Sequence, residues 1–195
     1  MNMLKNFFIS EVRVKILKLL LLNPDENYHV RAVVRAVDAE INAVRRELEN
    51  LISIGFLTRR QSSNRLYYAV NTEHPLYPEM LSLVAKEEGI GKAIIENADS
   101  IGHVEFAMVS KGFVKGREAT LLDVDLFVVG NISLDALTRI VKEQELKYGT
   151  EINFSTMTFD EFQYRKRTLD SFIMKILAQS RIMLVGDEER FCSLS

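Results

Sequence analysis

The sequence predicts an α+β protein in two parts, because the order of helical and strand-like segments changes midway along the chain. In the first part, apolar residues recur at helical spacing and two short alternating segments follow. In the second part, apolar strand-like runs alternate with helical segments, as in an α/β sheet with flanking helices. We therefore predict a first domain at 1–74, a helical linker at 75–99 and a second domain at 100–195.

The first part is expected to contain three helices and two strands. Ser10 is a suitable N-cap for the first helix, which ends at Asn23-Pro24-Asp25. A short extended segment at 28–30 and a helix at 31–37 follow, and a turn at Asp38-Ala39 leads into a third helix at 40–53. Gly55 is expected to close that helix, since glycine is favoured just beyond a helix end. Strands are predicted at 56–60 and 65–70, joined by a polar turn at 61–64.

The third helix has two opposite stripes. One is apolar and is expected to be buried: Ile41, Val44, Leu48, Leu51 and Ile52. The other is polar and is expected to face solvent: Asn42, Arg45, Arg46 and Glu49. This helix is therefore the best candidate for a surface that contacts a polar partner.

The order of these elements over about residues 10–72, and the stretch Leu48 to Leu57, resemble the winged helix-turn-helix of small bacterial regulators. The resemblance implies binding to double-stranded DNA, with the third helix in the major groove, where Asn and Arg pair with base edges. Asn42, Arg45 and Arg46 are the side chains expected there, and Arg59, Arg60 and Arg65 in the hairpin would meet phosphates or the minor groove. The alternative is that Arg45 and Arg46 pair with Glu49 and Glu47 on a solvated helix face.

Helices are expected in the linker at 78–87 and, after an interruption by Gly89 and Gly91, at 92–98. In the second part we predict strands at 104–109, 124–129, 151–157 and 181–185, and helices at 134–147 and 159–179. The last helix is expected to bury one face, made of Phe162, Leu169, Phe172, Ile173, Ile176 and Leu177. Arg165, Lys166 and Arg167 are expected on its solvated face.

The segment between the first two strands of this part has a distinctive spacing. Asp123 and Asp125 flank Val124, and an apolar run follows them. Ten residues separate Lys111-Gly112 from that pair. The pattern resembles the signature of the minimal nucleotidyltransferase domain, with Lys111-Gly112 in the place of the family's Gly-Ser.

The chemistry of that signature depends on both the Asp pair and the dipeptide that precedes it. Asp123 and Asp125, two residues apart on a strand, would present carboxylates on one side and could hold Mg²⁺ with Glu151 from the next strand. Such a metal pair clamps the oxygens of a nucleotidyl transfer. Lys111 and Gly112 would meet the triphosphate, but the family's hydroxyl is absent and Lys111 has the restricted backbone of a non-glycine residue. We therefore expect no catalytic residues and no cofactor, with Mg²⁺ required only if the site works, and Asp123 and Asp125 are otherwise strand-entry residues.

Composition excludes several classes. A hydrophobic share of 47% with 27% charged residues is ordinary for a soluble globular protein, and no apolar run reaches membrane-spanning length. The single cysteine, Cys192, excludes a disulfide framework, and the N-terminus lacks a signal-peptide pattern. We expect a cytoplasmic protein with no membrane partner.

The net charge of −2 hides an asymmetry. Residues 1–75 carry 11 Lys/Arg against 8 Asp/Glu, and the remainder carries 14 against 19. A basic part joined to an acidic part fits a protein in which only the first part touches nucleic acid.

Two functions follow from these patterns. In the first, the protein is a homodimeric DNA-binding transcriptional regulator whose nucleotidyltransferase-like domain senses a nucleotide or small-molecule effector or supports dimerisation. In the second, that domain is an active Mg-dependent nucleotidyltransferase that modifies a small molecule or a partner protein.

Overall fold

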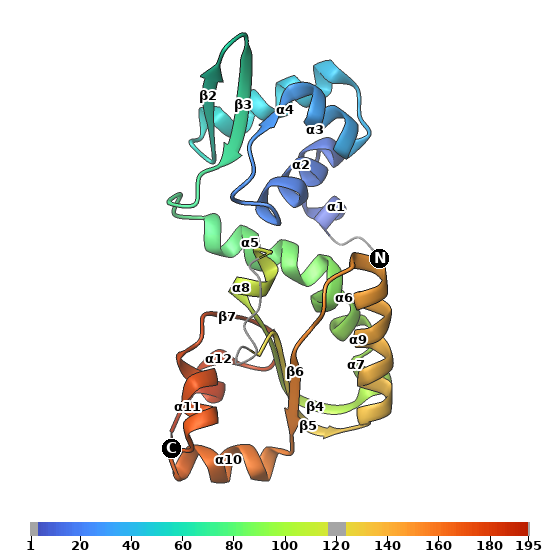
Figure 1. Ribbon diagram of the computed structural model, residues 1–195, viewed down its shortest axis with the longest axis vertical. Coiled ribbons are helices and arrows are strands. Elements are labelled where there is room, and N and C mark those ends of the chain that lie inside the picture. Colours follow the sequence, from blue (N-terminus) through green and yellow to red (C-terminus); the bar gives the residue numbers. More distant parts are fainter. Residues whose placement is uncertain (1–3, 117–123, 195) are drawn as a thin grey trace. The chain divides into compact units, whose positions relative to one another are not determined.

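The structure, a computed structural model, describes residues 4–116 and 124–194. The chain forms two compact units, Met1–Glu87 and Glu88–Ser195, each of which combines helices with one small sheet (Figure 1). The protein is therefore mixed α/β, and α+β overall.

The first unit is a group of packed helices joined to a hairpin. Strand β3 lies between β1 and β2 and pairs antiparallel with both. The elements, in order, are α1 (Leu4–Phe7), α2 (Glu11–Leu21), β1 (Tyr28–His29), α3 (Val30–Val37), α4 (Ile41–Ser53), β2 (Leu57–Ser62), β3 (Arg65–Val70) and α5 (Tyr77–Glu87).

Local signals in the sequence place the ends of these helices. The Ser10 hydroxyl accepts a hydrogen bond from the Arg13 N–H at 3.2 Å, which caps α2 as expected. Asp38, in the turn between α3 and α4, has a φ of 46°, and Gly55, directly after the C-cap of α4, has a φ of 74°. The three expected helices and both strands are confirmed, with small shifts of their ends.

The segment expected to be a linker belongs partly to each unit. Helix α5 is part of the first unit, and α6 and α7 are part of the second. Gly89, with a φ of 57°, is the first residue of α6, and Gly91 lies buried inside the same helix. The expectation that both glycines precede the helix is therefore wrong, because α6 begins at Gly89.

The second unit is a four-stranded sheet in the order β6-β5-β4-β7. Strands β5 and β6 are parallel and are joined through α9, as a parallel pair requires, whereas β4 is antiparallel to both β5 and β7. The elements, in order, are α6 (Gly89–Glu96), α7 (Ala98–Ile101), β4 (Gly102–Ser110), α8 (Lys111–Val114), β5 (Leu126–Ile132), α9 (Leu134–Tyr148), β6 (Phe154–Met157), α10 (Phe159–Arg167), α11 (Ser171–Ala178), β7 (Arg181–Val185) and α12 (Glu188–Cys192).

Helices cover both faces of this sheet (Figure 1). On one side, α6 and α7 pack against α9 and bury apolar residues of all three helices. On the other side, α10, α11 and α12 close a core rich in phenylalanine. Its buried members are Phe106, Met108, Phe127, Val129, Met157, Phe162, Ile173, Ile176 and Phe191.

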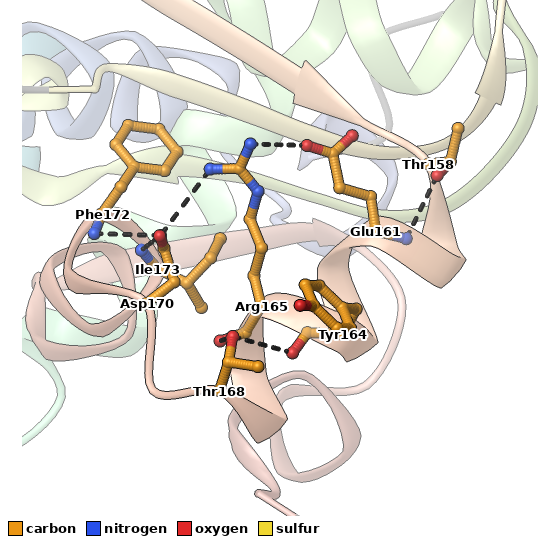
Figure 2. Close-up of polar contacts among 8 residues, drawn as sticks. All are labelled: Thr158, Glu161, Tyr164, Arg165, Thr168, Asp170, Phe172 and Ile173. Carbon is orange, nitrogen blue, oxygen red and sulfur yellow. Dashed lines mark hydrogen bonds and ion pairs between the residues drawn. The ribbon is translucent and has the colours of Figure 1, made fainter.

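The single helix expected at 159–179 is instead two helices, α10 and α11 (Figure 2). At the break, the Thr168 hydroxyl donates to the Tyr164 carbonyl oxygen at 3.1 Å, and Leu169 has a φ of 52°. Asp170 then caps α11, because its Oδ1 accepts from the backbone N–H groups of the next helix. Leu169, which was expected in the core, is consequently 60% exposed.

An arginine holds the corner between these helices. The Arg165 guanidinium lies 2.7 Å from a carboxylate oxygen of Glu161 and 3.7 Å from one of Asp170 (Figure 2). The signal for the break was present in the sequence, since an Asp followed by an apolar run is a common start of a helix.

Two further expectations for the second unit are wrong. Residues 151–153 precede β6, because the Ile152 N–H is bound by Glu145 of α9 at 2.8 Å rather than by a neighbouring strand. Lys166 is not on a solvated face but is 1% exposed. Its ammonium donates to the carbonyl oxygens of Arg190 and Phe191 at 3.3 and 3.1 Å, and burial lowers the pKa of Lys166.

No helix in residues 4–116 and 124–194 is long and apolar enough to cross a membrane.

The phenylalanine core should dominate the stability of the second unit. Phe162 is fully buried and stacks on Phe191 with a centroid distance of 5.2 Å. We expect Phe162→Ala to lower the free energy of unfolding of this unit by about 3–5 kcal/mol, since it removes buried contacts and leaves a cavity. Urea denaturation followed by circular dichroism measures the change. Leu146→Ala, at a site 87% exposed, is the control and should cost less than about 0.5 kcal/mol; equal losses would contradict this description of the core.

Candidate nucleic-acid interface

The outer face of α4 presents Asn42, Arg45 and Arg46, all exposed. The helix begins beside them at Glu40, whose carboxylate accepts from the N–H groups of Asn42 and Ala43 at 2.7 and 2.9 Å. These hydrogen bonds, and secondarily the charges of Arg45 and Arg46, lower the pKa of Glu40. The face therefore combines two arginines and an amide with one anionic cap.

The inner face of α4 is anchored by an ion pair with α2. The Glu47 carboxylate, with its side chain 5% exposed, accepts from Arg13 at 2.8 Å. Burial alone would raise the pKa of Glu47, but hydrogen bonds from Ser10, Arg13 and Asn50 and the charge of Arg13 together lower it. Glu47 thus fixes which face of α4 points outward.

The acids that might have neutralised Arg45 and Arg46 have other partners. Glu47 binds Arg13, and Glu49 lies 3.2 Å from Arg59 of the hairpin. The pairing of Arg45 and Arg46 with these two carboxylates, which the sequence left open, is therefore not the arrangement in the structure.

The hairpin separates its three arginines onto two faces. Arg59 is opposite Tyr68, whose side chain is buried, so Arg59 is on the side toward α4. Arg60 is opposite Tyr67, and Arg65 is opposite Ser62, so both are on the other face of the hairpin. All three arginines are exposed.

The pKa of Tyr68, a residue of the hairpin, is affected by charges on α4 as well as on the hairpin. Burial is the main cause that raises the pKa of Tyr68, and the charge of Glu49 raises it further. The charges of Arg59 and Arg45 act in the opposite direction. Charges of α4 and of the hairpin thus act on the same phenol, and the Arg59–Glu49 pair at 3.2 Å links the two elements directly.

Sequence reasoning missed two further basic residues on this unit. Arg31 and Arg35 are exposed on α3, one helical turn apart, and α3 packs against α4. Their i, i+4 spacing on a predicted helix was the available signal.

The second candidate site is at the end of β4. Helix α8 begins at Lys111 and contains Gly112, and Ser110 is its N-cap. The Ser110 hydroxyl accepts from the Phe113 N–H at 3.0 Å, and the Ser110 N–H donates to the Asp125 carbonyl oxygen at 2.8 Å. Lys111 and Gly112 are thus placed beside the start of β5.

Of the three carboxylates expected to hold Mg²⁺, two lie in the part of the chain that the structure describes. Asp123 lies outside the described residues. Asp125 is 2% exposed, and its Oδ2 accepts from the Asn153 N–H at 3.0 Å. Glu151 is exposed and lines an open surface depression of about 300 Å³ at the end of α9, with Lys142, Glu145, Leu146, Gly149 and Thr150. Among residues 4–116 and 124–194, no three His, Cys, Asp or Glu side chains form a group that could hold a metal ion.

No protein-family model and no curated protein matches the chain. Among solved structures, that of human N-acetylserotonin methyltransferase in complex with SAM matches with a TM-score of 0.31 and 13% identity. The match covers 90% of this chain and 46% of that chain, so this chain spans less than half of the enzyme's length, and a likeness this weak supports no conclusion about fold or function.

The Arg13–Glu47 pair gives a testable dependence of stability on pH. Because the folded-state pKa of Glu47 is lowered, its contribution is present above the unfolded-state pKa, about 4.3, and is lost as the pH falls through the folded-state value. Removing one partner of a buried pair costs about 3–5 kcal/mol, and Arg13 is partly exposed, so we expect about 2 kcal/mol for Arg13→Ala at pH 7.

Urea titrations at pH 7 and at about pH 3.5 measure this effect. The loss caused by Arg13→Ala should shrink in acid. In the control variant Glu47→Gln, which has no charge at this position, Arg13→Ala should cost the same at both pH values. A loss of equal size at both pH values in the unmodified background would show that the pair is not the cause.

Proposed function

We propose that this protein is a DNA-binding transcriptional regulator, with the first unit as a winged helix-turn-helix. The observation that carries the proposal is the exposed set Asn42, Arg45 and Arg46 on α4, a helix whose opposite face is anchored by Glu47. The order α2, β1, α3, α4 and then the hairpin β2–β3 also supports it. Because the resemblance is to small bacterial regulators, we also propose a cytoplasmic location.

The geometry suggests a division of roles on DNA. The N-terminal half of α4 would enter the major groove, where Arg pairs with guanine and Asn with adenine. Arg60 and Arg65, on the face of the hairpin away from α4, would meet phosphates or the minor groove. Arg59 would contribute less to DNA binding than Arg60 and Arg65, because it is already paired with Glu49.

For the second unit we propose a nucleotidyltransferase-like domain that is inactive and serves to sense a nucleotide or small-molecule effector or to support dimerisation. The antiparallel pair β4–β5 and the crossover through α9 to the parallel strand β6 are compatible with that resemblance. Among the described residues, the donors at this place do not fit Mg²⁺, since Asp125 is buried and accepts from a backbone N–H. Lys111 and Gly112 add no carboxylate or hydroxyl.

An active nucleotidyltransferase remains the alternative. One observation favours it: the backbone bond from Ser110 to Asp125 brings the start of α8, with Lys111, beside the strand that carries Asp125. In that case Lys111 would be a phosphate ligand and Asp123, Asp125 and Glu151 would hold Mg²⁺.

The DNA proposal is tested by selection from genomic fragments, followed by fluorescence anisotropy titrations on the enriched duplex. Arg45→Ala or Arg46→Ala should weaken specific binding by about 1–3 kcal/mol and relax the base preference at one position. Arg60→Ala or Arg65→Ala should weaken binding to all sequences and reduce the salt slope by about 1 each.

Arg139→Ala is the matched control, because this arginine is exposed on α9 in the other unit. It should leave both affinity and salt slope unchanged. Failure to enrich any fragment above non-specific affinity at low salt would reject the regulator.

The catalytic alternative is tested with labelled nucleoside triphosphates and Mg²⁺. We expect no transfer to protein or small molecules, since loss of one preorganised donor alone costs about 100- to 1000-fold in rate. The control is the double variant Asp123→Ala/Asp125→Ala. Labelling that depends on Mg²⁺ and vanishes in this variant would establish the enzyme instead.

A further inference from the structure

Helix α5 has an outer face that combines exposed leucines with charges of both signs. Leu76 and Leu83 are 58% and 43% exposed. They are seven residues apart and therefore lie on the same face, since the Leu76 carbonyl oxygen already accepts from the Met80 N–H at 3.0 Å. The opposite face is buried through Tyr77, Leu81, Val84 and Ala85.

Two charged residues flank these leucines. Glu79 is exposed three residues after Leu76, and Lys86 is half-buried three residues after Leu83. Both therefore lie along the same outer stripe of the helix. They are seven residues apart, about 10.5 Å along the helix axis, which is too far for an ion pair within one helix.

This arrangement is complementary to itself. If a second α5 packs antiparallel across a two-fold axis near residues 82 and 83, Glu79 of each copy faces Lys86 of the other, and the two Leu83 side chains meet beside the axis. An isologous interface of this kind uses one patch twice, which explains why an acid and a base are needed at equal distances from its centre. A nucleic acid would instead be repelled by Glu79 and gain nothing from the leucines.

We propose that the outer face of α5 is the interface of a symmetric dimer of this chain, in which Leu83 packs at the two-fold axis and two Glu79–Lys86 pairs set the antiparallel register. The role of this dimer rests on the proposed function, because a two-fold dimer presents two copies of α4 to two half-sites on DNA.

Charge reversal in the full-length chain tests the interface. Because of the two-fold axis, Glu79→Lys or Lys86→Glu alone turns both pairs into like charges, and each should raise the dimer dissociation constant by at least about tenfold in sedimentation equilibrium. The double reversal E79K/K86E restores opposite charges between the copies and should return the constant to within about threefold of the original. Leu83→Asp should abolish the dimer, whereas Leu146→Asp, at a site 87% exposed in the other unit, should not.

The outcomes separate this proposal from the proposed function. A chain that is monomeric throughout, single reversals without effect, or a double reversal that does not recover would each overturn the interface. Circular dichroism checks that every variant is folded. Binding of a mixed-sequence duplex at low salt, measured alongside, depends on α4 and the hairpin, so a monomer that still binds this duplex overturns the interface alone. A dimer that binds no DNA overturns the regulator and leaves the interface intact.

Discussion

The ion pair between Arg13 and Glu47 determines which surface of the first unit can meet a partner. Glu47 lies in the middle of α4, and its buried carboxylate is bound by a residue of α2, with Ser10 and Asn50 as further donors. A buried carboxylate is unfavourable unless it is paired. Rotating α4 about its axis would therefore remove the Glu47 carboxylate from its partners and would also expose Val44 and Leu48. Asn42, Arg45 and Arg46 are held outward as a result, and Arg59 of the neighbouring hairpin lies 3.2 Å from Glu49 of the same helix.

The second unit depends on a different constraint, the apolar filling of both faces of a small sheet. Four phenylalanines, Phe106, Phe127, Phe162 and Phe191, fill one side, and the break between α10 and α11 lets two helices cover that side in place of one. Two polar side chains of this unit, Asp125 and Lys166, are buried together with these apolar residues. The Asp125 carboxylate accepts from the Asn153 N–H just before β5, and the Lys166 ammonium donates to carbonyl oxygens of α12.

Much of the fold followed from the sequence because its signals are local. Ser10, Gly55, the exposed stripe of α4 and the buried Val44, Leu48 and Leu51 depend on neighbours within a few residues, and they were predicted correctly. Ile41 and Ile52, expected in the same buried stripe, are only half-buried. The errors concern tertiary contacts: the burial of Lys166 depends on carbonyl groups of α12, and the start of β6 depends on Glu145 of α9. The division of the hairpin arginines needed the strand register, which fixes Arg59 on one face and Arg60 on the other. The roles of the candidate site residues stay predictions.

We propose that α4 and the hairpin form the nucleic-acid-binding surface of this protein. Hydrogen–deuterium exchange of the full-length chain with and without a saturating selected duplex tests it most directly, because protection maps contact onto backbone segments. We predict slower exchange over the first turns of α4 and over β2–β3, with little change in β4–β7 of the second unit. Protection confined to the second unit, or none under conditions where the duplex is bound, would contradict the claim.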